Sequence, residues 1–574
     1  MADATAGRTS APAQGVATGV PTARRVADRV LSILPRRRDM ASMGRDPRKD
    51  VIAGLTVAVV ALPLALAFGV SSGLGAAAGL VTAVVAGVAA AIFGGSDLQV
   101  SGPTGAMAVV LVPIVAVDGP SGVLIVGLMA GIVLIGLALA RAGRVMRYVP
   151  LPVVEGFTLG IALVIALQQV PAALGTHGTG EKVSVVAWTA LRAWFSTPVW
   201  APVLIAGTVT GAMLLVVRLK PGLPVGLPAV AVVSAVVVLT GIQVPTIGAL
   251  PSGLPMPTLP YLDPARLSSL LLPAVAVAAL AAMESLLSAS VADALSVNSR
   301  HDPDRELFGQ GIANLLSPLF GGMPATAAIA RTAVNVRSGA VSRLSAMVHA
   351  VVLLAVVLVG SRLVAGVPLA ALAGVLIATC VQMVSVSSVR ALLGATRGDA
   401  AALLVTALAT VAFDLITAVI LGLAVSGLSA LAALSQSARL DEIPLEGSDD
   451  EAAGTSLLAE HVVVYRLDGP LFFGAAHTFL LELSEVHDVR VVVLRMSRVH
   501  AIDATGAHVL TDVVERLKAR GITVLLSGVR ENHEILLRRL GVYDNLAMSK
   551  HVFPDTPGAI DHARIHVDRL AHQD

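Results

Sequence analysis

One carboxylate and one arginine stand inside apolar stretches of this sequence. Glu284 lies near the centre of residues 270–296, where an unpaired charge inside a bilayer would cost roughly 3 kcal/mol. Ser288 follows four residues later, on the same face of a helix, and can add a second oxygen beside the carboxylate. Arg331 carries a charge that cannot be titrated away. We predict a functional role for Glu284, with a structural pair between Glu284 and Arg331 as the alternative.

Two short polar breaks share one pattern and predict two half-length helices. Phe93-Gly94-Gly95 leads to Thr104, and Phe320-Gly321-Gly322 leads to Thr326. Irregular backbone inside a membrane is tolerated where protein or a water-filled cavity surrounds it, so paired breaks in two halves of a chain indicate a transport site. One half-helix is expected to open at Thr104, Gly105 and Ala106, and the other at Thr326, Ala327 and Ala328.

Both predicted helix starts favour an anion, because helix N-termini present unpaired N–H groups and the positive end of the dipole. Arg331 follows Pro324 by seven residues and is expected about two turns into the second half-helix, where it adds fixed positive charge. The alternative is that Arg331 anchors the inner end of its helix.

The composition predicts a polytopic α-helical membrane protein. Of 574 residues, 55% are hydrophobic and 14% are charged, which is too apolar for an ordinary soluble protein. The net charge of +2 is too small to indicate a nucleic acid partner. The sequence shows no P-loop, nucleophile elbow, dinucleotide fingerprint or metal-ligand spacing. We therefore expect no enzymatic activity and no cofactor, and transport would depend on ion or substrate gradients.

Fourteen apolar segments are expected between Val51 and about Leu434. They lie near 51–70, 74–94, 103–116, 121–140, 149–170, 201–218, 224–241, 270–296, 307–320, 325–338, 340–364, 366–387, 397–413 and 414–434. The arginine and lysine residues of the connections favour a topology with both termini in the cytoplasm. Val149-Pro150-Leu151 recurs as Val367-Pro368-Leu369, in the same order and at nearly the same offset as the two breaks. Two halves of seven segments, inverted relative to each other, are therefore expected.

Soluble segments flank this region. Residues 1–49 are expected to form a basic cytoplasmic tail, 50–435 the transmembrane domain, 436–456 an acidic linker, 457–560 a small cytoplasmic α/β domain and 561–574 a C-terminal tail. Strands are predicted at 461–467, 491–494 and 522–526, and helices at 505–520 and 532–540.

Ordered motifs over about residues 48–555 resemble the SulP anion permeases with a C-terminal STAS domain. The motifs are Asp50-Val51-Ile52-Ala53-Gly54-Leu55-Thr56-Val57, Ala67-Phe68, Gly102-Pro103-Thr104-Gly105, Gly309-Gln310-Gly311-Ile312-Ala313-Asn314, Leu467-Asp468-Gly469-Pro470-Leu471-Phe472-Phe473 and Asp503-Ala504-Thr505-Gly506. The resemblance implies a core domain of segments 1–4 and 8–11 that moves against a gate domain. It places the substrate between half-helices 3 and 10, facing segments 1 and 8, where Phe68 joins the expected binding residues.

The resemblance leaves the anion and the coupling ion open. Sulfate or bicarbonate is expected first and a C4-dicarboxylate next, while a channel-like anion conductor and a transport-inactive sensor are further alternatives. Protonation of Glu284 would remove its repulsion of an incoming anion and couple the two fluxes. Sodium is the other candidate coupling ion, with Glu284 and Ser288 as its ligands. Membrane lipid, a second copy in a homodimer and a cytoplasmic protein at the STAS domain are the expected partners, and the expected location is the cytoplasmic membrane.

Overall fold

The computed structural model describes most of the chain and divides it into two compact units. The described residues are 33–35, 42–144, 149–180, 182–220, 223–251, 253–259, 264–296, 300–413, 415–436, 439–443, 461–472 and 489–571. Unit 1 is Met1–Leu423 and unit 2 is Ala424–Asp574. Most of the expected basic tail at 1–49 lies outside the described residues, and the first long helix begins within it, at Pro47.

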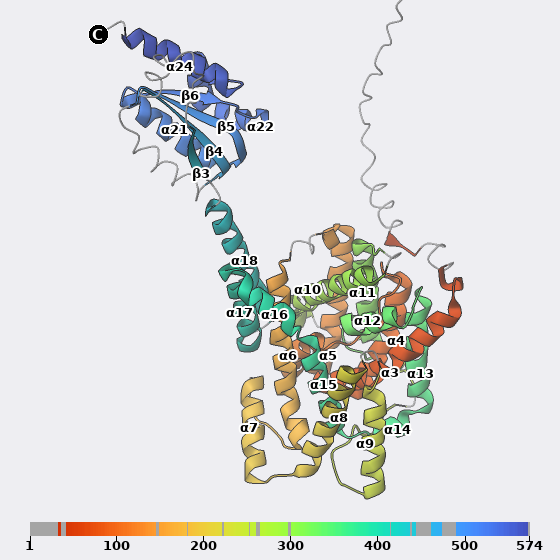
Figure 1. Ribbon diagram of the computed structural model, residues 1–574. Coiled ribbons are helices and arrows are strands. Elements are labelled where there is room, and N and C mark those ends of the chain that lie inside the picture. The colour runs from red at the N-terminus through yellow and green to blue at the C-terminus, as the bar shows by residue number, and fades with distance from the viewer. Residues whose placement is uncertain are drawn as a thin grey trace, which may run out of the picture. The chain divides into compact units, whose positions relative to one another are not determined.

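Unit 1 is helical (Figure 1). Its helices are α3 (Pro47–Ser71), α4 (Ala76–Phe93), α5 (Gly105–Leu139), α6 (Leu151–Leu174), α7 (Val183–Ser196), α8 (Trp200–Leu219), α9 (Gly226–Thr240), α10 (Pro264–Leu295), α11 (Pro303–Leu319), α12 (Ile329–Arg337), α13 (Leu344–Val359), α14 (Ser361–Ala365), α15 (Leu369–Met383), α16 (Val386–Ala395), α17 (Arg397–Ala412) and the beginning of α18 (Leu415–Gln436). In the described part of the chain, eight helical stretches are long and apolar enough to cross a membrane. The expected multi-pass membrane fold is confirmed.

Each of the fourteen apolar segments contains a helix or part of one, although segment 325–338 begins with the short strand β2 (Thr326–Ala327). Segments 103–116 and 121–140 are the two parts of α5, which is interrupted at Gly119, where φ is 69°. Glycine adopts this left-handed backbone without the steric cost that a side chain brings. Two helices of unit 1 were not predicted, α7 in the tryptophan-bearing connection and α16 before the thirteenth segment, because both are short and carry polar residues among the apolar ones. The inverted repeat stays a prediction.

The helices of unit 1 form two groups. Helices α3, α4, α5, α10, α11, α12 and α13 pack mainly on one another, and in the second group α15 packs on α6 and α8 while α17 packs on α6. This grouping separates segments 1–4 and 8–11 from the others. Helices α3 and α4 approach closely at Gly79, where a Cβ would collide with the backbone carbonyl of Ala65. Small residues thus permit the tight packing that associates helices in lipid.

Unit 2 contains a five-stranded sheet in the order β3-β4-β5-β6-β7 (Figure 1). Strand β3 (Arg439–Ile443) runs antiparallel to β4 (Val462–Leu471), and β5 (Val491–Ile502), β6 (Thr523–Ser527) and β7 (Val552–Phe553) continue parallel to β4. The helices are α21 (Ala504–Ala519), α22 (Glu531–Arg539), α23 (Val542–Met548) and α24 (Thr556–Ala571).

Alternate residues of the strands serve two apolar cores. Val492 and Leu494 pack with the α21 side of the sheet, whereas Val491 and Val493 pack with Ala559, Ala563 and Val567 of α24. This alternation follows from the period of two along a strand. It explains why β5 begins with four consecutive apolar residues, 491–494, since both faces of the strand are covered there.

Two domain boundaries differ from the sequence predictions. Part of the expected acidic linker, Arg439–Ile443, is strand β3, while residues 444–456 lie outside the described residues. The expected tail after residue 560 is the second half of α24, and its Ala563 and Val567 are buried against the sheet. The compact units divide at Leu423, inside α18, while α18 itself ends at Gln436, next to the predicted end of the transmembrane domain at 435.

Candidate anion site

The two polar breaks are hydrogen-bonded to each other. Strand β1 (Ser101–Gly102), which precedes α5, pairs antiparallel with β2 (Thr326–Ala327), which precedes α12. This pairing supplies hydrogen-bond partners for some of the backbone N–H and C=O groups that a broken membrane helix leaves unpaired. It also brings the beginnings of α5 and α12 together, although they lie far apart in the sequence.

The two half-helices begin at different distances from their breaks. Helix α5 starts at Gly105, and the Thr104 hydroxyl caps it by accepting from the Met107 N–H at 3.3 Å. Helix α12 starts only at Ile329, after the N-cap residue Ala328. The predicted helix start at 326–328 is therefore wrong by three residues, because Thr326 and Ala327 are extended in β2. Their backbone is held by the pairing with β1, and the Thr326 hydroxyl donates to the Ala281 carbonyl of α10 at 3.2 Å.

A polar stripe on α11 supports both breaks. Glu306, Gln310 and Asn314 are buried and lie four residues apart, hence on one helical face. Glu306 accepts from the Gly95 N–H at 2.9 Å and from Gln310 Nε2 at 2.9 Å, and the same Nε2 donates to Ser101 Oγ at 2.7 Å. These bonds hold the first break.

Asn314 holds the second break. Its Nδ2 donates to the Ala325 carbonyl at 2.8 Å, and its Oδ1 accepts from the Ala325 N–H at 2.9 Å. One side chain therefore satisfies both backbone groups of a residue in irregular structure. A side chain of α12 bonds the first break in a similar way, since Thr332 Oγ1 accepts from the Val100 N–H at 3.1 Å.

Arg331 lies in the first turn of α12, rather than two turns in as predicted. It is only 1% exposed. Its Nη2 donates to the Pro103 carbonyl at 2.9 Å, immediately before the start of α5. Its Nη1 is buried and has no hydrogen-bond partner in the described part of the chain. A buried guanidinium nitrogen without an acceptor carries a high desolvation cost, which an anion would relieve.

Gly102 leaves the space that the guanidinium occupies. A Cβ at this position would lie 2.8 Å from Arg331 Nη1 and 3.3 Å from Ala83 Cα. Any larger residue would therefore displace Arg331 or move β1 away from α4.

Glu284, on α10, also contacts the beginning of α5. Its Oε2 accepts from the Thr104 hydroxyl at 2.9 Å. Arg331 is near enough to interact with this carboxylate electrostatically, yet the described contacts include no hydrogen bond or ion pair between them. Glu284 and Arg331 thus bond the beginning of α5 separately, Glu284 at the Thr104 hydroxyl and Arg331 at the Pro103 carbonyl.

Ser288 does not share partners with Glu284. It is fully buried, and its hydroxyl donates to Thr332 Oγ1 of α12 at 2.9 Å. The i, i+4 spacing on α10 was predicted correctly, but the two side chains contact different residues.

The ring of Phe68, on α3, lies beside the beginning of α5. A Cβ on Gly105 would be 3.1 Å from a ring carbon of Phe68 and would collide with the Ile165 side chain. Phe68 and Ala106 are both buried. Six of the ten residues predicted at the site (Phe68, Thr104, Gly105, Ala106, Glu284 and Arg331) therefore gather around the beginning of α5. Thr326 and Ala327 form β2, Ala328 follows it, and Ser288 contacts α12 through Thr332.

The supporting residues Glu306, Gln310 and Asn314 were not predicted as part of the site. The sequence carries a signal for them, because three polar residues at i, i+4 and i+8 share one helical face, and such a face in a membrane protein must contact protein rather than lipid. The bonds that these residues make to loops more than ten residues away could not be derived from that spacing.

Comparisons with known proteins agree with this architecture. Residues 48–406 match the sulfate permease family and residues 458–559 match the STAS domain. The putative sulfate transporter YvdB of Bacillus subtilis is 35% identical over 88% of this chain and 96% of its own length. The bicarbonate transporter BicA of Picosynechococcus is 31% identical over 89% of this chain and 93% of its own length.

Solved structures show the same fold. The transmembrane domain of a cyanobacterial bicarbonate transporter, BicA, has a TM-score of 0.61 and 33% identity, and the match covers 65% of this chain and 98% of that one. SLC26A9 has a TM-score of 0.76 at 16% identity, with 99% of both chains covered, and supports the fold alone. The matched families and relatives are those of transporters rather than enzymes. This chain belongs to the sulfate permease family of anion transporters and carries a STAS domain at its C-terminal end.

Proposed function

We propose that this chain is a secondary active transporter of a small oxyanion, sulfate or bicarbonate, across the cytoplasmic membrane. One observation carries the proposal: Arg331, in the first turn of α12 and beside the start of α5, has a buried Nη1 with no hydrogen-bond partner among the described residues. Sulfate and bicarbonate have oxygen atoms that can accept from this nitrogen. The names of the relatives YvdB and BicA support the same two anions.

Three sources of positive potential support an anion at this place. The first N–H groups of α5 and of α12 have no partner within their own helices, and each helix directs the positive end of its dipole there. Arg331 adds a full charge. Low local polarity strengthens all three relative to water.

Glu284 supplies a means of coupling. An ionised carboxylate beside the start of α5 repels an arriving anion, whereas a protonated carboxyl does not. Uptake of one proton with one anion would therefore be favoured over uptake of either alone. In this proposal the Thr104 hydroxyl, which donates to Glu284 at 2.9 Å, links the state of the carboxyl to the anion-binding end of α5.

The two helix groups supply the moving parts. Helices α3–α5 and α10–α13 pack mainly among themselves, so they can move as one body against α6, α8, α15 and α17. Alternating access in this scheme exposes the bound anion to each side in turn. Membrane lipid around the helices, both termini in the cytoplasm, a homodimer and a cytoplasmic protein bound by the STAS domain belong to the same proposal.

The test is uptake by the purified full-length protein in proteoliposomes. Labelled sulfate, bicarbonate and succinate are offered under an imposed pH gradient, an imposed sodium gradient, or neither. The proposal expects uptake of sulfate or bicarbonate that an acidic exterior stimulates. Stimulation by sodium instead would assign Na⁺ as the coupling ion, with Glu284 and Ser288 as candidate ligands.

Glu284→Gln separates coupling from transport. The variant should keep anion exchange and lose the response to the pH gradient. Glu155→Gln is the matched control, because Glu155 is a partly buried carboxylate on α6, in the other helix group. A pH response that survives in Glu284→Gln excludes this carboxylate as the coupling group. Preferred uptake of succinate would assign a dicarboxylate, uptake without any gradient response would indicate a channel, and no flux of any anion would indicate a sensor.

A further inference from the structure

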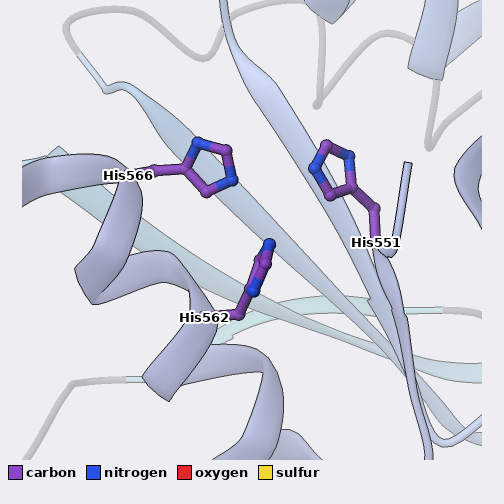
Figure 2. A group of neighbouring side chains, drawn as sticks. All are labelled: His551, His562 and His566. Carbon is purple, nitrogen blue, oxygen red and sulfur yellow. The ribbon is translucent and has the colours of Figure 1, made fainter. Parts of the chain in front are cut away.

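Three histidines of unit 2 meet at one edge of the sheet. His551 immediately precedes β7, and His562 and His566 lie one turn apart on α24. One ring nitrogen from each lies within 4.8 Å of the others. Figure 2 shows the three rings facing one another, with a nitrogen of each directed into the space between them.

The cluster is partly shielded from solvent. All three histidines are half-buried, the His551 and His562 ring centroids are 5.7 Å apart, and those of His562 and His566 are 5.1 Å apart. The Phe553 ring lies 5.1 Å from that of His562 and contributes an apolar side.

We propose that His551, His562 and His566 form a binding site for a divalent transition metal, with Zn²⁺ as the preferred ion. Three imidazoles are an established ligand set for Zn²⁺, and a water molecule or a partner's side chain would complete a tetrahedron. Two histidines at i and i+4 on a helix present both rings to one ion. No metal-ligand spacing was predicted from the sequence, although His562 and His566 have the spacing His-x₃-His.

The distances need only a small adjustment. Zn–N bonds of about 2.0–2.1 Å in a tetrahedron place the nitrogens about 3.3 Å apart. Rotation of half-buried rings on their side chains can close a separation of up to 4.8 Å to this value. The backbone of α24 and β7 can then stay in place.

The bound ion would fasten the last helix of the chain to the edge of the sheet. Helix α24 is anchored on the sheet by Ala559, Ala563 and Val567, all small or medium side chains. Strand β7 has only two residues. A metal shared between α24 and the residue before β7 stabilises both elements, because binding to the folded arrangement alone favours that arrangement by mass action. The site would thus make the order of α24 depend on metal concentration.

Metal binding is measured on the full-length protein, purified without a polyhistidine tag. After equilibration with Zn²⁺ and gel filtration, elemental analysis should find about one ion per chain that His562→Gln/His566→Gln does not retain. His508→Gln is the matched control, because His508 is an exposed histidine on α21. Co²⁺ should give the visible absorption of a four-coordinate site in the wild type and the control, but not in the double variant.

Hydrogen exchange provides a second readout that does not depend on the variant's purity or yield. Zn²⁺ should slow amide exchange in α24 at least about tenfold in the wild type and in His508→Gln, and leave the double variant unchanged. The proposal is overturned if the wild type retains no Zn²⁺ under these conditions, or if the double variant retains as much as the control. This site does not depend on the transport proposal, since neither readout involves an anion.

Discussion

Replacement of Arg331 by glutamine gives the sharpest test of the anion site. In the native protein Nη2 donates to the Pro103 carbonyl, while Nη1 is buried and has no partner in the part of the chain that the structure describes. The shorter, neutral glutamine removes the fixed charge and the donor offered to the anion. A hydrogen bond between charged groups contributes about 1.5–3 kcal/mol. Since about 1.4 kcal/mol corresponds to a factor of ten, the anion should bind about 10–150-fold more weakly.

Arg331→Lys separates charge from geometry. Lysine keeps the positive charge but carries its donors on a single nitrogen, so it cannot reproduce the planar fork that bonds the Pro103 carbonyl and an anion together. We expect binding about tenfold weaker than in the wild type, at the lower end of the glutamine range. Arg337→Gln is the matched control, because Arg337 is an exposed arginine at the other end of α12.

Equilibrium binding of labelled anion to the detergent-solubilised protein is the primary assay, and the KM for uptake is the second. Both are needed because KM equals a dissociation constant only when transport is slow relative to release. Thermal unfolding checks that each variant is folded. Affinities of Arg331→Gln and Arg337→Gln that agree within about twofold in folded protein would refute the role of Nη1.

Three further predictions concern support and stability. Gln310→Leu removes the side-chain donor that bonds Glu306 and the first break, and should lower the free energy of unfolding by about 3 kcal/mol. The thermal midpoint of unfolding should therefore be lower than that of the wild type. An unchanged midpoint would contradict the supporting role of Gln310. Asp503→Ala removes the helix cap that accepts from the Gly506 N–H at 2.7 Å and should lower the stability of α21 by about 1 kcal/mol. Amide exchange in the first turn of α21 should become faster. Asp503→Asn is the control, because it keeps the cap. Burial lowers the pKa of His533, so the unfolded state binds more protons and stability should fall as pH drops below about 6.5. His533→Leu should flatten that fall in amide exchange of α22, and an unaltered pH profile would exclude His533 as its source.

The positions of most helices could be predicted because long apolar runs leave few alternatives in a membrane. Thr104 and Glu284 were each singled out by residue type, since a polar break and an intramembrane carboxylate both require a polar environment. That they belong to one site was implied by the family resemblance. Their direct hydrogen bond could not be predicted, because it joins α5 to α10 across 180 residues of sequence.

The start of α12 shows why local signals were insufficient. Pro324 favours an extended residue before it and a helix start after it, so the sequence predicted a helix from about 325. Pairing with β1 instead keeps Thr326 and Ala327 extended. The position of Arg331 shifted with the helix start, from the second turn to the first.

Helix α24 was missed for a different reason. Its buried face consists of Ala559, Ala563 and Val567, and the residues between them are largely polar. So weak an apolar stripe does not stand out from a soluble tail. The helix is recognisable only once the sheet face that it covers is known.

The pairing of β1 with β2 has a consequence for synthesis of the chain. Gly102 is paired with Thr326, so the ribosome must add 224 further residues before the first break can meet its partner. At about 5–20 residues per second this takes about 10–45 s. During that interval the backbone of the first break has neither β2 nor the α11 side chains to bond. Until then, water or the insertion machinery must supply the hydrogen bonds of this break.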